Sequence, residues 1–392
     1  MEVIGESIKV PVTIIRGGTS KGIFIKKEFL PSDTALRDKL ILGIFGSPDK
    51  RQIDGLGGAD PLTSKLAIIS SSSIKGVDVN YTFAQVEIDK PVVDYSLTCG
   101  NLLAGAAVFA INKGMVEVKE PLTEVAIFDT NVKKKSKVKV RVKNGKALVE
   151  GNLHIDGVEG TGSKIELEFL RPEGPITGKL FPFGKTSFLL GNGINVTVGD
   201  AGVLACFMKA SDIGLKGDEG PKEIDSNFLL LNKVKKIKAE ILTALNMVKN
   251  KEEAFKKYPN LPKFVFISKP KDFYSPINGK LVKKSEIELL ARVITDGKLH
   301  KAFPVTSGIA TAVATCIPGT ILAEVIGNSI KKEEFIEKEK RIRIGHPSGV
   351  MEVRINLRKQ KNNWLVEKAV VGRTARIIMD GIAYVPLSKL KR

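Results

Sequence analysis

Long apolar runs, cysteines and histidines are scarce in this chain of 392 residues. No stretch approaches the roughly 20 consecutive apolar residues that a membrane-spanning helix needs. The first residues lack the basic start and apolar run of a signal peptide. The three cysteines, Cys99, Cys206 and Cys316, are too few and too widely spaced for a disulfide framework. These absences predict a cytoplasmic protein without a membrane partner.

Motifs for metals and nucleotides are also missing. His154, His300 and His346 lie far apart, and none is at metal-ligand spacing from a cysteine. The segment FPFGKTS at 181–187 lacks the first glycine of a phosphate-binding P-loop, because Lys179 stands in its place. No G-x-G-x-x-G motif follows a predicted strand. We therefore expect no metal site and a chemistry that needs no cofactor.

Aromatic residues make up only 6% of the chain, whereas 62 basic residues outnumber 43 acidic ones. The resulting net charge of +19 is the strongest argument for a nucleic-acid partner. Aromatic platforms for stacking single strands are few, however, and acidic residues are interspersed among most of the lysine clusters. We expect a solvated, lysine-rich surface, and we do not expect nucleic-acid binding.

The chain carries an internal repeat. PVTIIRGGTSKGIFIKK at 11–27 aligns with NVTVGDAGVLACFMKAS at 195–211, and TCGNLLAGAAVFAINKG at 98–114 resembles TSGIATAVATCIPGT at 306–320. Two matches in the same order indicate duplicated domains. The length also exceeds what one typical core accommodates. We place one domain at 1–188, with 376–392 as a segment that can complete it, and the other at 189–375.

The repeat units read as α+β. Alternating β-branched segments predict antiparallel strands. They lie at 77–88, 122–128, 138–142, 164–170 and 349–357. The segments beginning at Cys99 and Ser307 are apolar on all sides, which predicts buried helices, and 222–249 reads as one amphipathic, basic helix. We predict two pseudo-symmetric domains, each a curved, mostly antiparallel sheet wrapped around a central buried helix, with the active site in the cleft between them.

The segment TCGN at 98–101 opens the first buried helix. Backbone N–H groups at a helix start lack internal partners and attract carboxylate or phosphate, and Gly100 lets a ligand approach the backbone. A thiol at this position has a lowered pKa, so Cys99 is a candidate nucleophile or acid/base. A free cysteine that merely fills the core is the other interpretation, and the residues alone leave both open.

The segment TSG at 306–308 holds the matching place in the second repeat. It can cap a helix and present N–H groups to an anion, although ordinary Thr and Ser caps explain it as well. Two such helix starts facing each other would hold a di- or tricarboxylate. In IGHPSGVMEV at 344–353, His346 and Ser348 form a polar turn that could contact the ligand, and turn composition alone explains it equally.

Two further segments carry polar residues between apolar strands. Lys65 in GLGGADPLTSKLAI precedes an apolar run, and partial burial would lower its pKa toward the range of a general base. A surface lysine is the alternative interpretation. In the corner RGGTSKG at 16–22, the side chains of Thr19, Ser20 and Lys21 suit a carboxylate. The second repeat has DAGVLA at 200–205 instead, so only the first corner has the hydroxyls and the cation.

Six segments together resemble one family. IRGGTSKGIF, GLGGADPLTSKLAI, TCGNLLAGAAVFAI, IPGT, IGHPSGVMEV and GRTARIIMDGIAYVP run in order from residue 15 to 386 and resemble the PrpF family of 2-methylaconitate cis-trans isomerases. The resemblance implies a diaminopimelate epimerase-like fold. It also implies a cofactor-independent isomerase that moves a double bond in an unsaturated di- or tricarboxylate by proton transfer.

The resemblance also implies roles for residues. Lys65 would be the base, and Cys99 either the partner acid or a residue lining the site. The substrate-binding candidates are Thr19, Ser20, Lys21, Ser64, Gly100, Asn101, Thr306, Ser307, Gly308, His346 and Ser348. Because Ser307 stands where related epimerases have a second thiol, and Cys316 is nine residues further along, a two-thiol racemase is not expected. Arg292 is one candidate for a substrate-facing arginine.

The residues do not decide which carboxylate is the substrate, or between an isomerase and a protein of another functional class. Beside 2-methylaconitate, the alternatives are 4-oxalomesaconate, methylitaconate and aconitate. Alternatives of another class are an accessory role beside an aconitase-like dehydratase and, less expected, nucleic-acid binding through the basic surface. A homodimer is compatible with the sequence.

Overall fold

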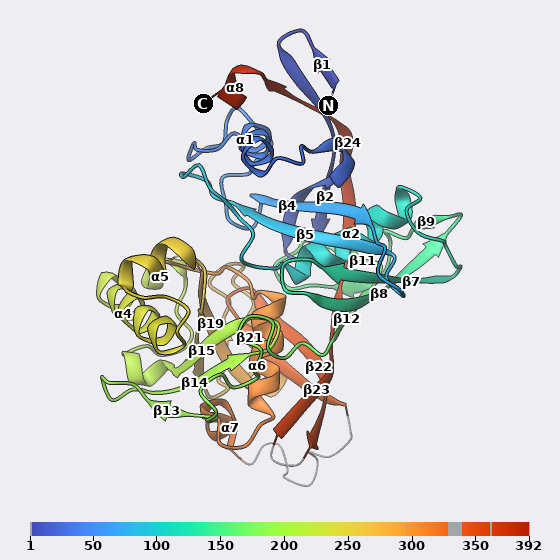
Figure 1. The fold of residues 1–392 in the computed structure, drawn as a ribbon. Helices are drawn as coiled ribbons and strands as arrows, with labels where there is room; N and C mark the ends of the chain where they lie inside the picture. The colour runs from blue at the N-terminus through green and yellow to red at the C-terminus, as the bar shows by residue number, and fades with distance from the viewer. Residues whose placement is uncertain (1, 296, 328–338, 361–362, 392) are drawn as a thin grey trace. The chain divides into compact units, whose positions relative to one another are not determined.

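The computed structural model describes residues 2–295, 297–327, 339–360 and 363–391 (Figure 1). The chain forms two compact units. Unit 1 comprises Met1–Leu167 and Gly372–Arg392, and unit 2 comprises Glu168–Val371.

The unit boundaries lie at 167/168 and 371/372, not at 188/189 and 375/376. Residues 168–187 belong to unit 2 because their backbone forms hydrogen bonds with other segments of that unit. The amide of Arg171, for example, donates to the carbonyl of Glu367 at 3.1 Å. The C-terminal segment joins unit 1 because its strand pairs with the second strand of the chain over its whole length.

Unit 1 combines a sheet with one buried and two outer helices. Its elements are β1 (Glu2–Ile4), β2 (Ser7–Gly17), β3 (Ser20–Lys26), η1 (Lys27–Phe29), α1 (Thr34–Phe45), β4 (Lys65–Ser71), β5 (Val79–Val86), β6 (Val93–Asp94), α2 (Gly100–Asn112), β7 (Leu122–Asp129), β8 (Lys134–Lys143), β9 (Lys146–Ala147), β10 (Leu153–His154), β11 (Thr161–Gly162), β24 (Ala375–Pro386) and α8 (Ser388–Lys391). Strand β12 (Ile165–Leu170) continues from unit 1 into unit 2, and β23 (Asn363–Arg373) of unit 2 ends in unit 1 with Gly372 and Arg373.

Unit 2 has the same kinds of element. They are β13 (Phe188–Leu189), β14 (Asn195–Asp200), β15 (Leu204–Lys209), η2 (Ala210–Ile213), α3 (Pro221–Asp225), α4 (Phe228–Ala244), α5 (Lys251–Lys257), β16 (Lys263–Ser268), β17 (Phe273–Tyr274), β18 (Leu281–Val282), η3 (Lys284–Glu286), β19 (Leu289–Thr295), β20 (Lys298–Leu299), α6 (Val305–Thr315), α7 (Ile321–Ile326), β21 (Lys340–His346), β22 (Gly349–Gln360) and β23 (Asn363–Arg373).

The two units share one strand topology. In unit 1, β2 is antiparallel to β3, β3 parallel to β4, β4 antiparallel to β5, β5 parallel to β7 and β7 antiparallel to β8. In unit 2, strands β14, β15, β16, β19, β21 and β22 pair in the same order with the same directions. The predicted α+β fold of two related, mostly antiparallel domains is confirmed.

Each unit is built around one buried helix. Helix α2 lies against β2, β3, β4, β5, β8 and β24, and α6 lies against β14, β15, β21 and β22. Small residues permit this close approach: a Cβ on Gly105 of α2 would lie only 2.7 Å from the ring of Phe24. The two helices predicted from their all-round apolar composition are therefore both central, as expected.

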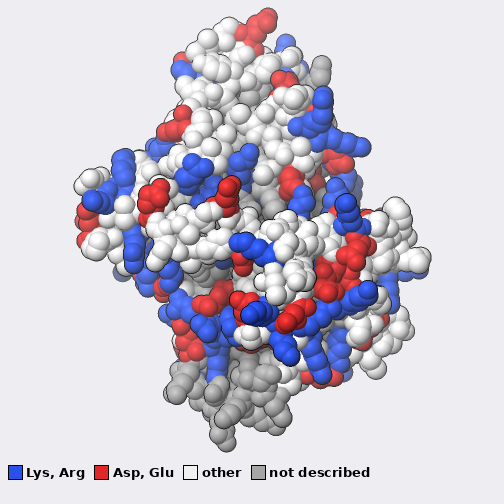
Figure 2. Space-filling view, turned by 180° about the vertical axis from the view of Figure 1, so that it is seen from behind, with Lys and Arg blue, Asp and Glu red and all other residues white. Residues whose placement is uncertain are grey.

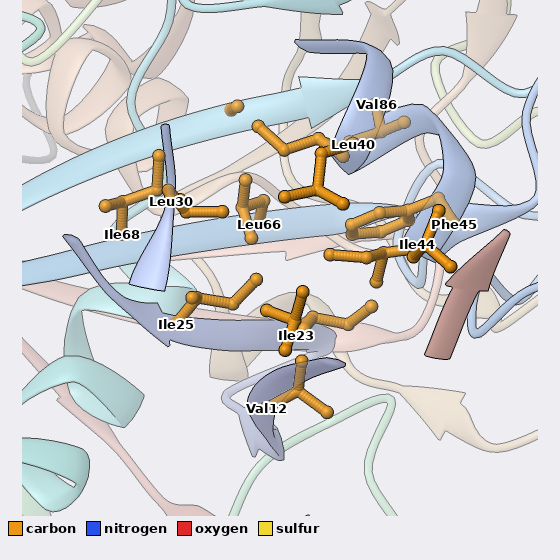
Figure 3. Close-up of a cluster of buried hydrophobic side chains, with 14 of the residues drawn as sticks. Val12, Ile23, Ile25, Leu30, Leu40, Ile44, Phe45, Leu66, Ile68 and Val86 are labelled. Carbon is orange, nitrogen blue, oxygen red and sulfur yellow. The ribbon is translucent and has the colours of Figure 1, made fainter. Parts of the chain in front are cut away.

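A second core in unit 1 lies on the other face of the sheet. Ile23 and Ile25 of β3 and Leu66 and Ile68 of β4 pack with residues of α1, among them Phe45 (Figure 3). Because side chains alternate between the faces of a strand, the residues between these point toward α2. This alternation decides which polar side chains of β3 and β4 can reach the start of the central helix.

The basic segment at 222–249 is not one helix. It divides into α3 and α4 because Asn227 caps the second of them, its side chain accepting a hydrogen bond from the amide of Leu230. No helix in the described part of the chain is long and apolar enough to cross a bilayer. Figure 2 shows basic and acidic side chains interspersed over one face, as they are in the sequence.

Candidate active site

The hairpin corners of both units lie on the first turn of the central helix. Gly18, between β2 and β3, has a φ of +50°, and Gly202, between β14 and β15, has a φ of +73°. A Cβ on Gly18 would lie 2.1 Å from Oδ1 of Asn101, and one on Gly202 would lie 3.3 Å from the carbonyl of Thr306. The repeat that aligned these two glycines thus describes a real structural correspondence.

Cys99 is the residue that precedes α2, in extended conformation with a φ of −129°. Cys99 is partly exposed, whereas Cys206 and Cys316 are buried. Burial raises the pKa of the Cys316 thiol to about 12, and it also raises the pKa of Cys206. Among the three thiols, Cys99 alone combines access with a helix start, where N–H groups favour a negative charge.

Strand ends hold the backbone on both sides of Cys99. The hydroxyl of Tyr81 in β5 donates to the carbonyl of Cys99 at 3.0 Å. The hydroxyl of Thr98 donates to the carboxyl group of Asp129 at the end of β7. Tyr81 is fully buried and Asp129 is 6% exposed, so both side chains that hold this segment are themselves fixed in the protein interior. The N-terminus of α2 is therefore clamped from two neighbouring strands.

Lys65 begins β4 and points toward α2, because its neighbours Leu66 and Ile68 point into the outer core (Figure 3). Its Nζ donates to Oε1 of Gln85 at 2.7 Å and lies 5.2 Å from the ring centroid of Phe83. Burial lowers the pKa of Lys65, and the negative charges of Cys99, Asp60 and Glu87 act to a lesser extent in the opposite direction. A lowered pKa increases the fraction of free amine, which a general base requires.

A hydrogen-bonded chain lies over the first turn of α2. The side-chain amide of Asn101 donates to Oγ1 of Thr19 at 3.0 Å, and its Oδ1 accepts from Nε of Arg373 at 3.0 Å. The corner is held by a second arginine, since Nη1 of Arg16 donates to the carbonyl and to Oγ1 of Thr374, both at 2.9 Å. Thr19 and Asn101 thus lie together beside Cys99 and Gly100.

The side chains of Ser20 and Lys21, the other two corner candidates, point to opposite faces of β3. Ser20 is 3% exposed and shares its face of β3 with Gly22 and Phe24, which pack against α2. Lys21 shares its face with Ile23 and Ile25 of the outer core. The side chain of Lys21 is therefore directed away from Cys99, because consecutive residues of a strand point to opposite faces.

Ser64 lies next to Lys65 but is engaged within the protein. Its hydroxyl donates to the carbonyl of Val86 at 2.8 Å and accepts from the side-chain amide of Gln52, also at 2.8 Å. The residue has no exposed surface. Ser64 thus anchors the loop before β4, and that loop in turn sets the position of Lys65.

In unit 2 the helix starts earlier than the repeat alignment predicts. The residue before α6 is Pro304, and Ser307 is the third residue of the helix. Counted from the helix starts, Cys99 therefore corresponds to Pro304, and Ser307 corresponds to Leu102. The expected cap at Thr306 and Ser307 is wrong. Pro304 bears no proton donor or acceptor on its side chain, so unit 2 has no thiol at the position that matches Cys99.

Ser307 has a property that a cap would lack. It is completely buried, and its Oγ has no hydrogen-bond partner among the residues that the structure describes. Gly308 serves packing, because a Cβ there would lie 2.7 Å from Cε of Met351. Cys316 lies at the end of α6, as expected from its distance in sequence.

His346 and Ser348 form a buried turn in unit 2. The amide of Ser348 donates to Nδ1 of His346 at 3.2 Å, and the Ser348 hydroxyl donates to the carbonyl of Lys301 at 2.5 Å. The ring of His346 stacks on Phe303, just before α6. This turn therefore holds the segment that leads into α6.

Arg292, the arginine candidate from the sequence, is fully buried in β19. Its Nε donates to the carbonyl of Glu219 at 2.8 Å, and its guanidinium lies over the ring of Phe273. Leu290, two residues earlier on the same face of β19, also packs with Phe273. Arg292 thus belongs to a packed layer on this face of the sheet.

Four residues of the site in unit 1 escaped the sequence analysis: Tyr81, Gln85, Asp129 and Arg373. Tyr81 and Gln85 are each two residues from Phe83 in β5, so all three side chains lie on one face of the strand. The alternation of β5 could therefore have placed Tyr81 and Gln85 on the same face as Lys65. Arg373 and Asn101 are 272 positions apart, and no local pattern connects them.

Replacing Asp129 by Asn is expected to change how stability depends on pH. Burial raises the pKa of Asp129 from 3.8 to about 6, although Thr98, Asn131 and Val132 donate hydrogen bonds to it. The folded protein therefore holds this proton more tightly than the unfolded chain, and ionisation on going from pH 4 to pH 7 lowers the free energy of unfolding by about 2 kcal/mol. The variant should lack this loss.

Denaturant unfolding at several pH values between 4 and 7 measures the effect. The control is Asp89→Asn at an exposed position, which should follow the wild type. Parallel curves for the wild type and Asp129→Asn would contradict the assignment.

Comparison with known proteins identifies relatives along the whole chain. The family model described as PrpF protein matches residues 7–386. The 3-methylitaconate isomerase of Eubacterium barkeri is 41% identical over 99% of this chain and 100% of its own. The 2-methyl-aconitate isomerase of Shewanella oneidensis is 36% identical, covering 97% of each chain. The (4E)-oxalomesaconate Delta-isomerase of a Novosphingobium species is 36% identical over 96% of this chain and 97% of its own.

Solved structures agree with these matches. A methylitaconate-delta-isomerase crystal structure has a TM-score of 0.79 at 41% identity and covers 98% of both chains. A hydroxyproline epimerase from Agrobacterium vitis, at 12% identity and a TM-score of 0.54 over 97% of this chain and 93% of its own, shares the fold. The epimerase-like fold predicted from the sequence is thereby confirmed. The matches span nearly the whole chain, and the protein belongs to the PrpF family of isomerases.

Proposed function

We propose that this isomerase moves a carbon–carbon double bond in an unsaturated di- or tricarboxylate by allylic proton transfer, with no cofactor. The observation that carries the proposal is the amine of Lys65. The amine is partly buried, has a lowered pKa and faces the central helix. It lies near enough to Cys99 for an ionised thiol to raise its pKa. The relatives are named for isomerisation of 3-methylitaconate, 2-methyl-aconitate and (4E)-oxalomesaconate, so the substrate belongs to this class.

In the proposed reaction, the free amine of Lys65 removes a proton from the carbon next to the double bond. The electron pair left behind delocalises over the allyl unit and a carboxylate, forming a dienolate. Backbone N–H groups at the start of α2 stabilise the negative charge that develops there. The proton then returns at the other end of the allyl unit, or at the same carbon after rotation. Cys99 either returns this proton or lines the site.

Proton exchange tests both the class and the substrate. The purified protein is incubated in deuterated water with 2-methylaconitate, aconitate, 4-oxalomesaconate or 3-methylitaconate, and proton NMR follows each allylic position. We expect 2-methylaconitate to exchange and isomerise. Exchange of another compound in its place would assign that substrate, and no exchange with any of the four would favour an accessory role beside a dehydratase.

A further inference from the structure

Arg373 is a buried cation for which the described residues supply no anionic partner. The residue is 6% exposed. Nε donates to Oδ1 of Asn101 at 3.0 Å, and Nη1 donates to the carbonyl of Gly372 at 2.7 Å. Both acceptors are neutral, and no hydrogen bond of Nη2 to a described residue is found. The guanidinium is therefore fixed in place while part of its donor set stays unused.

Arg373 has fewer acidic groups around it than the buried Arg292, whose pKa is influenced by Asp218, Glu219 and Glu223. Burial lowers the pKa of Arg373 to about 10, and among the described residues only an ionised Cys99 thiol would act in the opposite direction. Isolated buried charges are unfavourable, and proteins normally pair them. Even the partly exposed Arg343 is paired, since it binds Glu288 through two nitrogen atoms. An anion from outside the chain would restore the balance at Arg373.

We infer that Arg373 binds a carboxylate of the substrate at the start of α2, beside Cys99. A hydrogen bond from a guanidinium N–H to a carboxylate oxygen is charge-assisted and is stronger than one between neutral groups. Asn101 and Gly372 hold Nε and Nη1, so Nη2 is the donor directed to the ligand. The first N–H groups of α2 add a second set of donors to the same anion.

This inference rests on the proposed function only for the identity of the anion. The binding of a carboxylate beside Cys99 does not depend on the isomerase reaction, so the experiment that tests it measures no turnover.

Alkylation of Cys99 by two matched reagents provides that measurement. In both cases the thiolate attacks the methylene carbon, a carbon–sulfur bond forms, and the carbon–iodine bond breaks with release of iodide. Iodoacetate carries a carboxylate where iodoacetamide carries a neutral amide. The ratio of their rate constants therefore reports attraction of a carboxylate, while a change in the thiol itself alters both rates together. Peptide mass spectrometry confirms that Cys99 is the alkylated residue.

We expect the iodoacetate-to-iodoacetamide ratio of the wild type to exceed that of glutathione. In Arg373→Gln the ratio should fall about tenfold, as expected for loss of a charge-assisted contact. Arg373→Lys should keep part of it. The control Arg376→Gln removes an exposed arginine three residues along and should leave the ratio unchanged. Tricarballylate, a saturated tricarboxylate, should slow alkylation of the wild type by iodoacetamide at concentrations that leave Arg373→Gln unprotected.

Two results would overturn the inference: a wild-type ratio no greater than that of glutathione, or equal ratios in the wild type and a folded Arg373→Gln. The first needs no variant, so it holds even where Arg373→Gln does not fold. A preference for iodoacetate in a protein that exchanges no allylic proton would leave the carboxylate site standing and reject the isomerase chemistry.

Discussion

Replacing Lys65 by Met is expected to abolish proton exchange at the allylic carbon and to lower turnover at least 100-fold. Methionine is unbranched and nearly as long as lysine, but it lacks the amine that lies over the ring of Phe83. Exchange of the substrate with deuterated water, followed by proton NMR, measures the loss directly. Exchange at the wild-type rate would remove Lys65 from the role of base.

Two further variants separate the base from the charge. Lys65→Arg retains a cation that stays protonated, so it should be as inactive as the methionine variant. Lys75→Met changes an exposed lysine in the loop between β4 and β5 and should be fully active. Because only the neutral amine removes a proton, wild-type turnover should rise with pH until Lys65 is deprotonated. The lowered pKa places this rise below the range of an ordinary lysine.

The second large effect is expected at Gly18. An alanine there would adopt a φ of +50°, which disfavours any side chain, and its Cβ would lie 2.1 Å from Oδ1 of Asn101 and 3.0 Å from Cδ of Arg373. The backbone strain and the clash add, so Gly18→Ala should lower the free energy of unfolding by about 3 kcal/mol. It should also reduce turnover, because Asn101 and Arg373 must move.

Gly76→Ala provides the matched control. Gly76 has a φ of +72°, yet a Cβ added there would have nothing within 4 Å, so the variant carries the strain without the clash. We expect it to lose about 1 kcal/mol and to keep its activity. Denaturant unfolding and the exchange assay are measured on both variants. Equal losses would show that the contact of Gly18 with Asn101 has no role of its own.

Local sequence patterns predicted the elements that build the site. Apolar residues on all sides marked α2 and α6 as buried, and β-branched alternation marked β5, β7 and β22 as strands. These patterns are visible in the sequence because burial of a helix and alternation along a strand constrain residues that are close together in the chain. The break between α3 and α4 was missed because the capping role of Asn227 depends on a single hydrogen bond.

The repeat predicted the pairing of the two hairpin corners but not the register of the two helices. Sequence similarity aligned Cys99 with Ser307, whereas the helix starts in the structure match Cys99 to Pro304. A short, apolar helix segment resembles itself after a shift of three or four residues, because that shift preserves its buried face. Only the packing of each corner on its helix decides the register.

The sequence by itself determined the duplicated α+β fold and the family, and it offered Lys65 and Cys99 as candidate catalytic residues, whose roles stay proposals. These depend on composition, order and motifs along the chain. The tertiary structure decided which other groups join them. It directed Lys21 to the outer core and placed Arg373 on Asn101, across 272 positions of sequence. The physical reason is strand pairing. A residue's face follows from the register of its strand, and Arg373 reaches the start of α2 because the strand that follows it, β24, pairs with β2.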